Sequence, residues 1–149
     1  MKWIDIPPVW LAGALVLAWL QKTYAPMDLG FGPVVGDLLG GLLIGGGVVL
    51  MAMAVLELRR HSTTVIPHME ADRLVTSGIF GRSRNPIYLG DAAILAGFIF
   101  YWDAVLALPL VPLLVALLER RFILAEERRL RRKFLADWGR YAQKTRRWL

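Results

Sequence analysis

The chain has 149 residues, a length typical of a single domain, and 56% of them are hydrophobic. The formal net charge is +6, and the absence of cysteine excludes disulfides, thiolate nucleophiles and cysteine-bound metals. Residues 34–56 contain one ionisable side chain, Asp37, whereas the helix of a soluble core alternates polar and apolar faces. We therefore predict an all-α integral membrane protein with about four transmembrane helices, in which residues 1–149 form one domain.

The first predicted span covers about residues 8–20. One lysine before an apolar run is also typical of a signal peptide, but no small-x-small cleavage site follows Leu20, so we expect a retained helix. This span is short, which favours tilting or local thinning of the bilayer. The segment that follows, residues 25–33, is rich in Pro and Gly and predicts a turn.

The second predicted span covers about residues 34–58 and is rich in glycine. Gly36 and Gly40 are four residues apart, as are Gly41 and Gly45, and this spacing allows another helix to pack closely. Helix packing is the favoured interpretation, and a ligand that approaches the bare backbone is the alternative.

Residues 59–85 are predicted to form a polar loop, and the third span covers about residues 86–102. Pro86 suits the start of this helix because its missing N–H group would be unbonded in a first turn anyway. Asp91 lies just inside the span, where an ionisable group is costly and usually functional. Pairing of Asp91 with an arginine of the loop is the alternative.

The fourth predicted span covers about residues 104–118. A very tight turn at Asp103 precedes it, so the third and fourth spans should form an antiparallel helical hairpin. Pro109 and Pro112 are expected to kink the fourth helix.

Positive charge is concentrated in the loop and in the tail, residues 119–149. The tail has 11 Lys and Arg against 4 Asp and Glu, so it carries a net +7 and the first 118 residues sum to −1. The two turns on the other side of the predicted spans have no Lys or Arg. The positive-inside rule therefore predicts that loop, tail and N-terminus all face the cytoplasm.

The tail is expected to continue the fourth span as a basic helix. Residues at helical spacing form one stripe of it, while arginines fill the other sides: Glu119, Ile123, Glu126, Leu130, Phe134, Trp138 and Tyr141. This helix either lies at the interface on anionic lipid head groups or folds back so that Glu126 and Glu127 close a site over the loop. Nucleic acid is not expected as a partner of a basic segment beside a membrane span.

Polar side chains of the loop reach the same interface as this Glu pair: His68, Arg84, Asn85 and Tyr88. Such a cluster could hold a zwitterionic ligand, and surface salt bridges of the Glu pair are the alternative. His68 has no second His or Cys at ligand spacing, so no metal is expected. The sequence contains neither of the common glycine-rich phosphate-binding motifs, which gives no support to a soluble nucleotide-binding fold.

Residues 63–90 read TTVIPHMEADRLVTSGIFGRSRNPIYLG, which closely resembles the hallmark of a family of integral-membrane methyltransferases. That family includes isoprenylcysteine carboxyl methyltransferase and the phospholipid N-methyltransferases. The tail is similar to its second hallmark, a Glu pair followed by Leu, aromatic residues and a terminal Arg-Trp: Glu126, Glu127, Leu130, Phe134, Trp138, Tyr141, Arg147 and Trp148. Together the two motifs cover most of residues 63–149.

The resemblance implies S-adenosylmethionine as cofactor and S-adenosylhomocysteine as product. By position, the cofactor-binding residues would be His68, Leu74, Val75, Gly78, Arg84, Asn85, Pro86, Tyr88, Gly90, Glu126 and Glu127. Arg84 and Glu127 would be the catalytic residues, and Arg147 and Trp148 would bind a membrane lipid or another amphiphilic acceptor. We expect the active site to face the cytoplasm, in a prokaryotic inner membrane.

The sequence departs from the family pattern at four places. Phe80 replaces a common Tyr, Leu135 replaces the Gly that usually follows the Phe, Trp138 replaces a Tyr, and Thr145-Arg146 replaces Val-Pro. The lost phenols bear more on substrate specificity than on cofactor binding. Two other functions stay open: a membrane reductase of the sterol-reductase kind that uses NADPH, and a non-enzymatic protein whose basic tail binds lipid.

Overall fold

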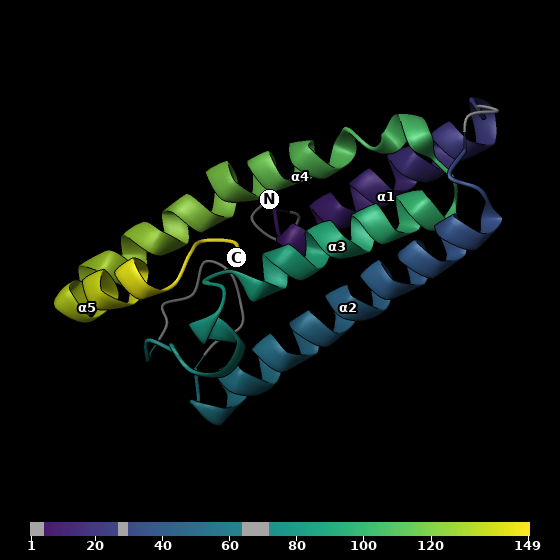
Figure 1. Cartoon of the computed structure of the whole chain (residues 1–149). Coiled ribbons are helices and arrows are strands. Elements are labelled where there is room, and N and C mark those ends of the chain that lie inside the picture. Colours follow the sequence, from purple (N-terminus) through teal and green to yellow (C-terminus); the bar gives the residue numbers. More distant parts are fainter. Residues whose placement is uncertain (1–4, 27–29, 64–71) are drawn as a thin grey trace.

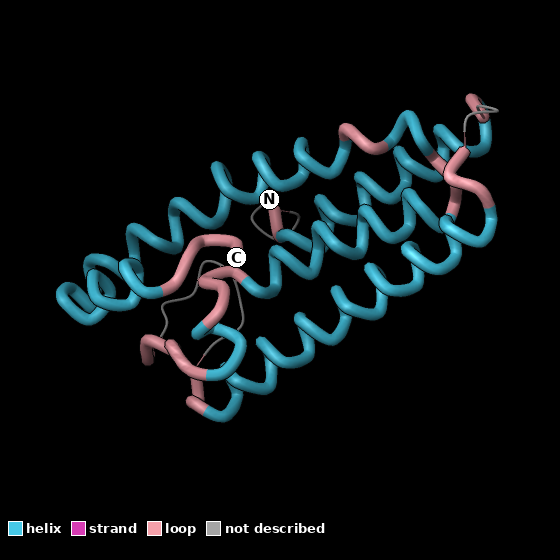
Figure 2. The backbone as a smooth tube through the Cα atoms, viewed as in Figure 1, coloured by secondary structure: helices cyan, strands magenta, loops and turns pink. Residues whose placement is uncertain are grey.

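The computed structural model describes residues 5–26, 30–63 and 72–149, which form helices and connecting loops without a strand (Figures 1 and 2). The five α-helices are α1 (Pro7–Tyr24), α2 (Pro33–Arg60), α3 (Pro86–Tyr101), α4 (Leu110–Leu118) and α5 (Leu124–Lys144). The predicted all-helical class is therefore confirmed. Within the described residues, α2 alone is both long and apolar enough to cross a membrane, and α3 is a shorter apolar helix. Four membrane crossings stay a prediction.

Proline marks the start of three of these helices. Pro7, Pro33 and Pro86 each occupy the first turn of α1, α2 and α3. A first turn has no intrahelical partner for the missing N–H group, so proline fixes the backbone there without the loss of a hydrogen bond.

The helices place the loop and the tail at the same end of the molecule. Figure 1 shows α1 to α4 side by side, with α5 and the loop between α2 and α3 at one end and the turns after α1 and α3 at the other. Pro7, at the start of α1, lines the same cavity as residues of the loop and of α5. The loop, the tail and the start of α1 therefore share one end of the molecule, and the side of the membrane that this end faces stays a prediction.

Glycine lets α2 and α3 pack backbone against backbone. A Cβ atom on Gly47 would lie 2.8 Å from the carbonyl oxygen of Gly90, and one on Gly90 would lie 2.8 Å from that of Gly47. Gly40 makes the same close approach to Gly97. Gly41 and Gly45, the other predicted pair, have open space around them, so the expected packing uses one glycine face of α2.

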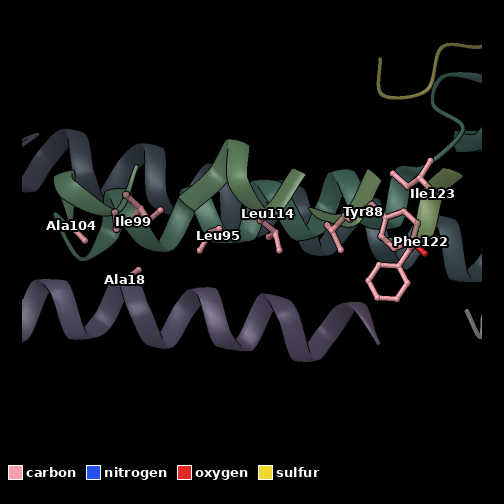
Figure 3. Packing of buried hydrophobic residues seen from close by; sticks show 10 residues of the cluster. Ala18, Tyr88, Leu95, Ile99, Ala104, Leu114, Phe122 and Ile123 are labelled. Atoms are coloured by element: carbon pink, nitrogen blue, oxygen red, sulfur yellow. The ribbon is translucent and has the colours of Figure 1, made fainter. Parts of the chain in front are cut away.

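The hydrophobic core lies between α1, α3 and α4 (Figure 3). Ala18 of α1, Leu95 and Ile99 of α3 and Leu114 of α4 belong to one cluster of buried residues, and Ala18, Leu95 and Ile99 have no exposed surface. The core extends through Phe122 towards the cavity described below.

The fourth helix begins later than predicted. The segment expected to be helical from residue 104 contains the short 3₁₀ turn η2 (Val105–Ala107), and α4 begins at Leu110. Pro109 is the cap of α4 and Pro112 lies in its first turn, where proline is tolerated, so neither kinks the helix as expected. The irregularity comes later, at the π-helical turn η3 (Glu119–Ile123) that joins α4 to α5.

The tail is not one straight helix. Leu135 has φ +44° and ψ −112° inside α5, and the chain reverses there, which Figure 1 shows as the yellow end folding back. The stripe predicted along one continuous helix is therefore interrupted, and Trp138 and Tyr141 lie on a second segment that returns towards the loop. Hydrogen bonds from this segment to the loop, described below, agree with the alternative in which the tail folds back.

Candidate functional site

A cavity of about 710 Å³ lies where the loop, α5 and the ends of α1, α2 and α3 meet. The loop and α5 contribute its charged walls: Arg73, Arg84, Glu126, Glu127, Arg129, Arg132 and Lys133. The helical bundle contributes apolar walls: Pro7, Pro8, Met51, Val55, Leu58 and Ile87. The Lys, Arg and Glu side chains of the lining thus all come from the loop and α5, whereas the bundle wall is apolar apart from Tyr88 and Asp91.

Eight of the predicted cofactor-binding residues line this cavity: Leu74, Val75, Arg84, Asn85, Pro86, Tyr88, Glu126 and Glu127. They come from two segments, residues 74–88 and 126–127, and Tyr88 and Glu126 are 38 positions apart in the chain. His68 lies outside the described residues. Gly78 and Gly90 do not line the cavity.

The two glycines outside the cavity lining have other structural reasons to be glycine. Gly78 has φ +57°, and a Cβ atom there would lie 2.8 Å from the Glu57 carboxyl carbon. Gly90 is needed for the close contact with Gly47 of α2. Both glycines were expected to bind the cofactor by their position in the family motif. Turn geometry at Gly78 and helix packing at Gly90 also require the absence of a side chain.

Arg84 and Glu127, the predicted catalytic pair, form an ion pair. Arg84 Nη2 lies 3.1 Å from Glu127 Oε1, and both side chains are largely buried. Arg84 Nη1 also donates a 3.1 Å hydrogen bond to the carbonyl oxygen of Ala142, and the guanidinium lies 5.6 Å from the centre of the Trp138 ring. Arg84 Nε is buried and donates to no group of the described residues. Arg84 is therefore held in place with one donor still available.

Glu127 is bound by a second arginine. Arg147 donates from Nε and Nη2 to the two carboxylate oxygens of Glu127 at 3.1 and 2.8 Å, and from Nη1 to Glu119 at 2.6 Å. The hydrogen-bonded carboxylate of Glu127 raises the pKa of Arg147, so this guanidinium stays charged. Trp148 donates to Glu119 at 3.3 Å. The predicted acceptor-binding residues Arg147 and Trp148 thus contact the protein's own carboxylates and do not line the cavity.

Residues 145–149, here called the C-terminal strap, lie along the loop. The backbone N–H of Arg84 donates to the carbonyl oxygen of Arg146 at 3.0 Å, and Asn85 Nδ2 donates to that of Arg147 at 3.0 Å. Figure 2 shows the strap returning beside the segment that leads into α3. The two sequence hallmarks are therefore joined by one backbone hydrogen bond, one side-chain hydrogen bond to the backbone, and charge.

Two tyrosines connect the tail to the loop and to α3. Tyr88 of α3 donates a 2.7 Å hydrogen bond to Glu126 Oε1. Tyr141 donates a 2.7 Å hydrogen bond to the carbonyl oxygen of Phe80, and burial raises the pKa of its phenol, so it remains a donor. Both phenols fix groups of the cavity wall, because Phe80, Tyr88, Glu126 and Tyr141 all line it.

A sequence profile of the phospholipid methyltransferase family matches residues 35–137, which is more than half of the chain. The chain belongs to this family. Neither a curated protein nor a solved structure matches it. The match begins in α2 and ends inside α5, so it includes every charged residue that lines the cavity.

Family membership makes this chain a membrane-associated methyltransferase. The cavity is the place in the described structure where residues of both hallmarks meet, which makes it the candidate active site. Its chemistry suits methyl transfer, because this reaction mainly requires alignment of two bound groups and exclusion of water.

Two features of the site go beyond the residues assigned to it from the sequence. Asp91, which the sequence marks as either functional or paired with an arginine, lines the cavity with 1% of its surface exposed. Trp138, a departure from the family pattern, places its ring against Arg84. A tryptophan face is the best aromatic partner for a cation, so this departure adds an interaction to the site.

Proposed function

We propose that this methyltransferase uses S-adenosylmethionine and transfers its methyl group to a lipid-like or isoprenoid acceptor at the cytoplasmic face of the membrane. The observation that carries the proposal is the uneven lining of the cavity, in which the loop and α5 supply all the Lys, Arg and Glu side chains and the bundle supplies a mainly apolar wall that also contains Tyr88 and Asp91. A charged cofactor and an apolar acceptor tail can both be accommodated in such a space.

The residues present fit the cofactor. The cavity volume of about 710 Å³ lies within the range of about 300–1,000 Å³ that is usual for small-molecule sites. Glu126 and Glu127 would hold the ammonium and the ribose hydroxyls, and the free Nε of Arg84 together with Asn85 would hold the carboxylate. The aromatic face of Tyr88 favours the sulfonium. When bound, the cofactor supplies an activated methyl group.

The acceptor would enter from the bilayer with its tail against the apolar wall. Each buried CH₂ group contributes about 0.8 kcal/mol, so an acceptor already dissolved in the membrane is preferred over its free head group. Arg129 and Arg132 line the charged side and would orient an anionic head group. The basic outer surface of α5 would at the same time contact anionic lipid head groups.

The proposed orientation follows from the arrangement of charge. The N-terminal end of α1, the loop and α5 share one end of the molecule, and the loop and tail carry most of its Lys and Arg. By the positive-inside rule, this end would face the cytoplasm. Four crossings and a prokaryotic inner membrane remain part of the proposal.

Binding of S-adenosylhomocysteine to the purified full chain tests the cofactor. We expect wild-type protein to bind it and Glu126→Gln to bind it about ten-fold less tightly or worse, because a charge-assisted hydrogen bond contributes about 1.5–3 kcal/mol. Asp137→Asn on the exposed side of α5 is the matched control and should bind as wild type does. Binding of NADPH in place of S-adenosylhomocysteine would favour the reductase and overturn the proposal.

A chain-length series of acceptors tests lateral entry. With detergent held constant, shortening the tail should raise KM strongly while the head group stays the same. Equal KM values for long-chain and head-group-only acceptors would reject entry from the bilayer.

A further inference from the structure

Asp91 is a buried carboxyl group in the cavity wall that the proposed cofactor contacts do not use. Its residue is 1% exposed, and its Oδ2 atom accepts no hydrogen bond from the described part of the chain. A carboxylate removed from water without a partner is costly, and such groups are retained in membrane helices mainly for function. Asp91 also lines the cavity, so a ligand in the cavity can supply the missing partner.

The position of Asp91 puts it on the acceptor side of the cavity. It is three residues after Tyr88 on α3, so the two side chains lie on the same face of the helix. It is also five residues beyond Pro86, which places it about 7.5 Å further from the loop along the helix axis. Gly90, the residue before it, packs against Met51, and Met51 belongs to the apolar wall.

The ionised form of Asp91 distinguishes among the nucleophiles that can be methylated. A carboxylate nucleophile would place a second negative charge beside this buried side chain, and like charges repel strongly where solvent screening is weak. A hydroxyl, thiol or amine carries a hydrogen that can be donated to Oδ2. The vacant Oδ2 position therefore fits a nucleophile that carries a proton and does not fit an ionised carboxylate.

We propose that Asp91 is an acceptor-binding residue. Its Oδ2 receives the hydrogen bond, and then the proton, of an X–H nucleophile at the head of a lipid-soluble acceptor, where X is the oxygen, sulfur or nitrogen atom that becomes methylated. The inference rests on the proposed function and adds the chemical class of the acceptor. In the transfer, a lone pair of X forms the bond to the methyl carbon, the carbon–sulfur bond breaks with its electrons staying on sulfur, and the proton of X passes to Asp91.

The test uses the full chain in phosphatidylcholine nanodiscs without cofactor. Four probes share the same 16-carbon tail and end in an amine, a hydroxyl, a thiol or a carboxylate. The apparent Kd of each probe is obtained from the change of the thermal unfolding midpoint with the mole fraction of probe. For wild type, we expect the apparent Kd of at least one X–H probe to be lower than that of the carboxylate probe by about ten-fold or more. A hydrogen bond to a charged group accounts for a difference of this size. In Asp91→Asn this preference should fall to less than about two-fold.

Asp37→Asn is the matched control, because Asp37 is an exposed carboxyl on α2 that does not line this cavity. It removes the same charge from the bundle and should keep the wild-type preference. An unchanged preference in Asp91→Asn, or tightest binding of the carboxylate probe by wild type, would overturn the role of Asp91.

Failure of the proposed function can be distinguished from failure of the inference about Asp91. Asp91→Asn should bind S-adenosylhomocysteine as wild type does, while its KM for an X–H acceptor rises. Loss of S-adenosylhomocysteine binding in Asp91→Asn would assign the residue to the cofactor and overturn the inference. Absence of that binding in wild type would contradict the proposed function, and the cofactor-free probe series would still decide the role of Asp91.

Discussion

The guanidinium of Arg84 lies 3.1 Å from the carboxylate of Glu127, and this ion pair joins the central loop to α5 inside the candidate active site. The two residues come from the two separate hallmarks of the sequence. The same carboxylate also binds Arg147, so the loop, α5 and the C-terminal strap are connected through one side chain. A cofactor that binds here meets a charge network that is already ordered.

Removal of Arg84 should affect activity far more than removal of an arginine on the outer surface. Arg84→Ala deletes a largely buried cation that contacts Glu127, so we expect turnover to fall about ten-fold or more, on the basis of about 1.5–3 kcal/mol for a charge-assisted hydrogen bond. Arg131→Ala removes an exposed charge from α5 and should change turnover by less than about two-fold. Equal losses in the two variants would reduce Arg84 to one member of the basic surface.

The C-terminal strap should contribute to stability through Arg147. Arg147→Met removes contacts with Glu119 and Glu127, and we expect the free energy of unfolding to fall by about 1–3 kcal/mol. Arg140→Met is the control, because Arg140 pairs with Asp137 at an exposed site where an ion pair contributes about 0–1 kcal/mol. Denaturant unfolding in detergent measures both, and a strap without structural importance would give equal values.

Substitution of Gly90 distinguishes a role in helix packing from a role in cofactor binding. Gly90→Ala places a Cβ atom 2.8 Å from the carbonyl oxygen of Gly47, so overpacking should lower the free energy of unfolding by about 1–3 kcal/mol. S-adenosylhomocysteine affinity of the folded protein should stay near the wild-type value. Gly45→Ala, with open space around it, should leave stability unchanged or raise it by up to about 1 kcal/mol. A loss of affinity without a loss of stability in Gly90→Ala would restore its predicted role at the cofactor.

Leu135 stands where the family usually has glycine, and the structure explains that preference. Its φ of +44° is costly for a residue with a side chain, and 71% of the residue is exposed, so little packing compensates. Leu135→Gly should therefore raise the free energy of unfolding by about 1 kcal/mol. Arg131→Gly, at an exposed position of α5, should lower it by about 1 kcal/mol. Destabilisation in both variants would show that the reversal does not strain the backbone.

Much of the fold could be predicted from local chemistry. Pro86 marks the start of α3, a signal that depends on residues close in sequence. Close packing of α2 was also predicted, but of its two predicted glycine pairs only Gly36 and Gly40 make such contacts, and Gly41 and Gly45 do not. The Glu pair and the Arg-Asn-Pro segment were expected to meet, and they do meet in one cavity.

The reversal of the tail could not be predicted in the same way. Leu135 gives no turn signal, and the helical spacing of apolar residues continues past it to Trp138 and Tyr141. Contacts made after the reversal, such as that from Tyr141 to Phe80, impose the change of direction, and these contacts join residues 61 positions apart. The engagement of Arg147 with Glu119 and Glu127 depends on that same reversal, so these contacts could not be predicted from the sequence either.

Transfer of a labelled methyl group to lipid tests the central claim most directly. Purified wild-type protein and Glu127→Gln are incubated with S-adenosylmethionine labelled in its methyl group and a total lipid extract, and the lipid fraction is separated and identified. We predict labelled lipid with wild type and a loss of about ten-fold or more with Glu127→Gln, the loss expected when one charge-assisted hydrogen bond is removed. Labelling that is absent with wild-type protein, or unchanged in Glu127→Gln, would contradict the assignment of this cavity as a lipid methyltransferase site.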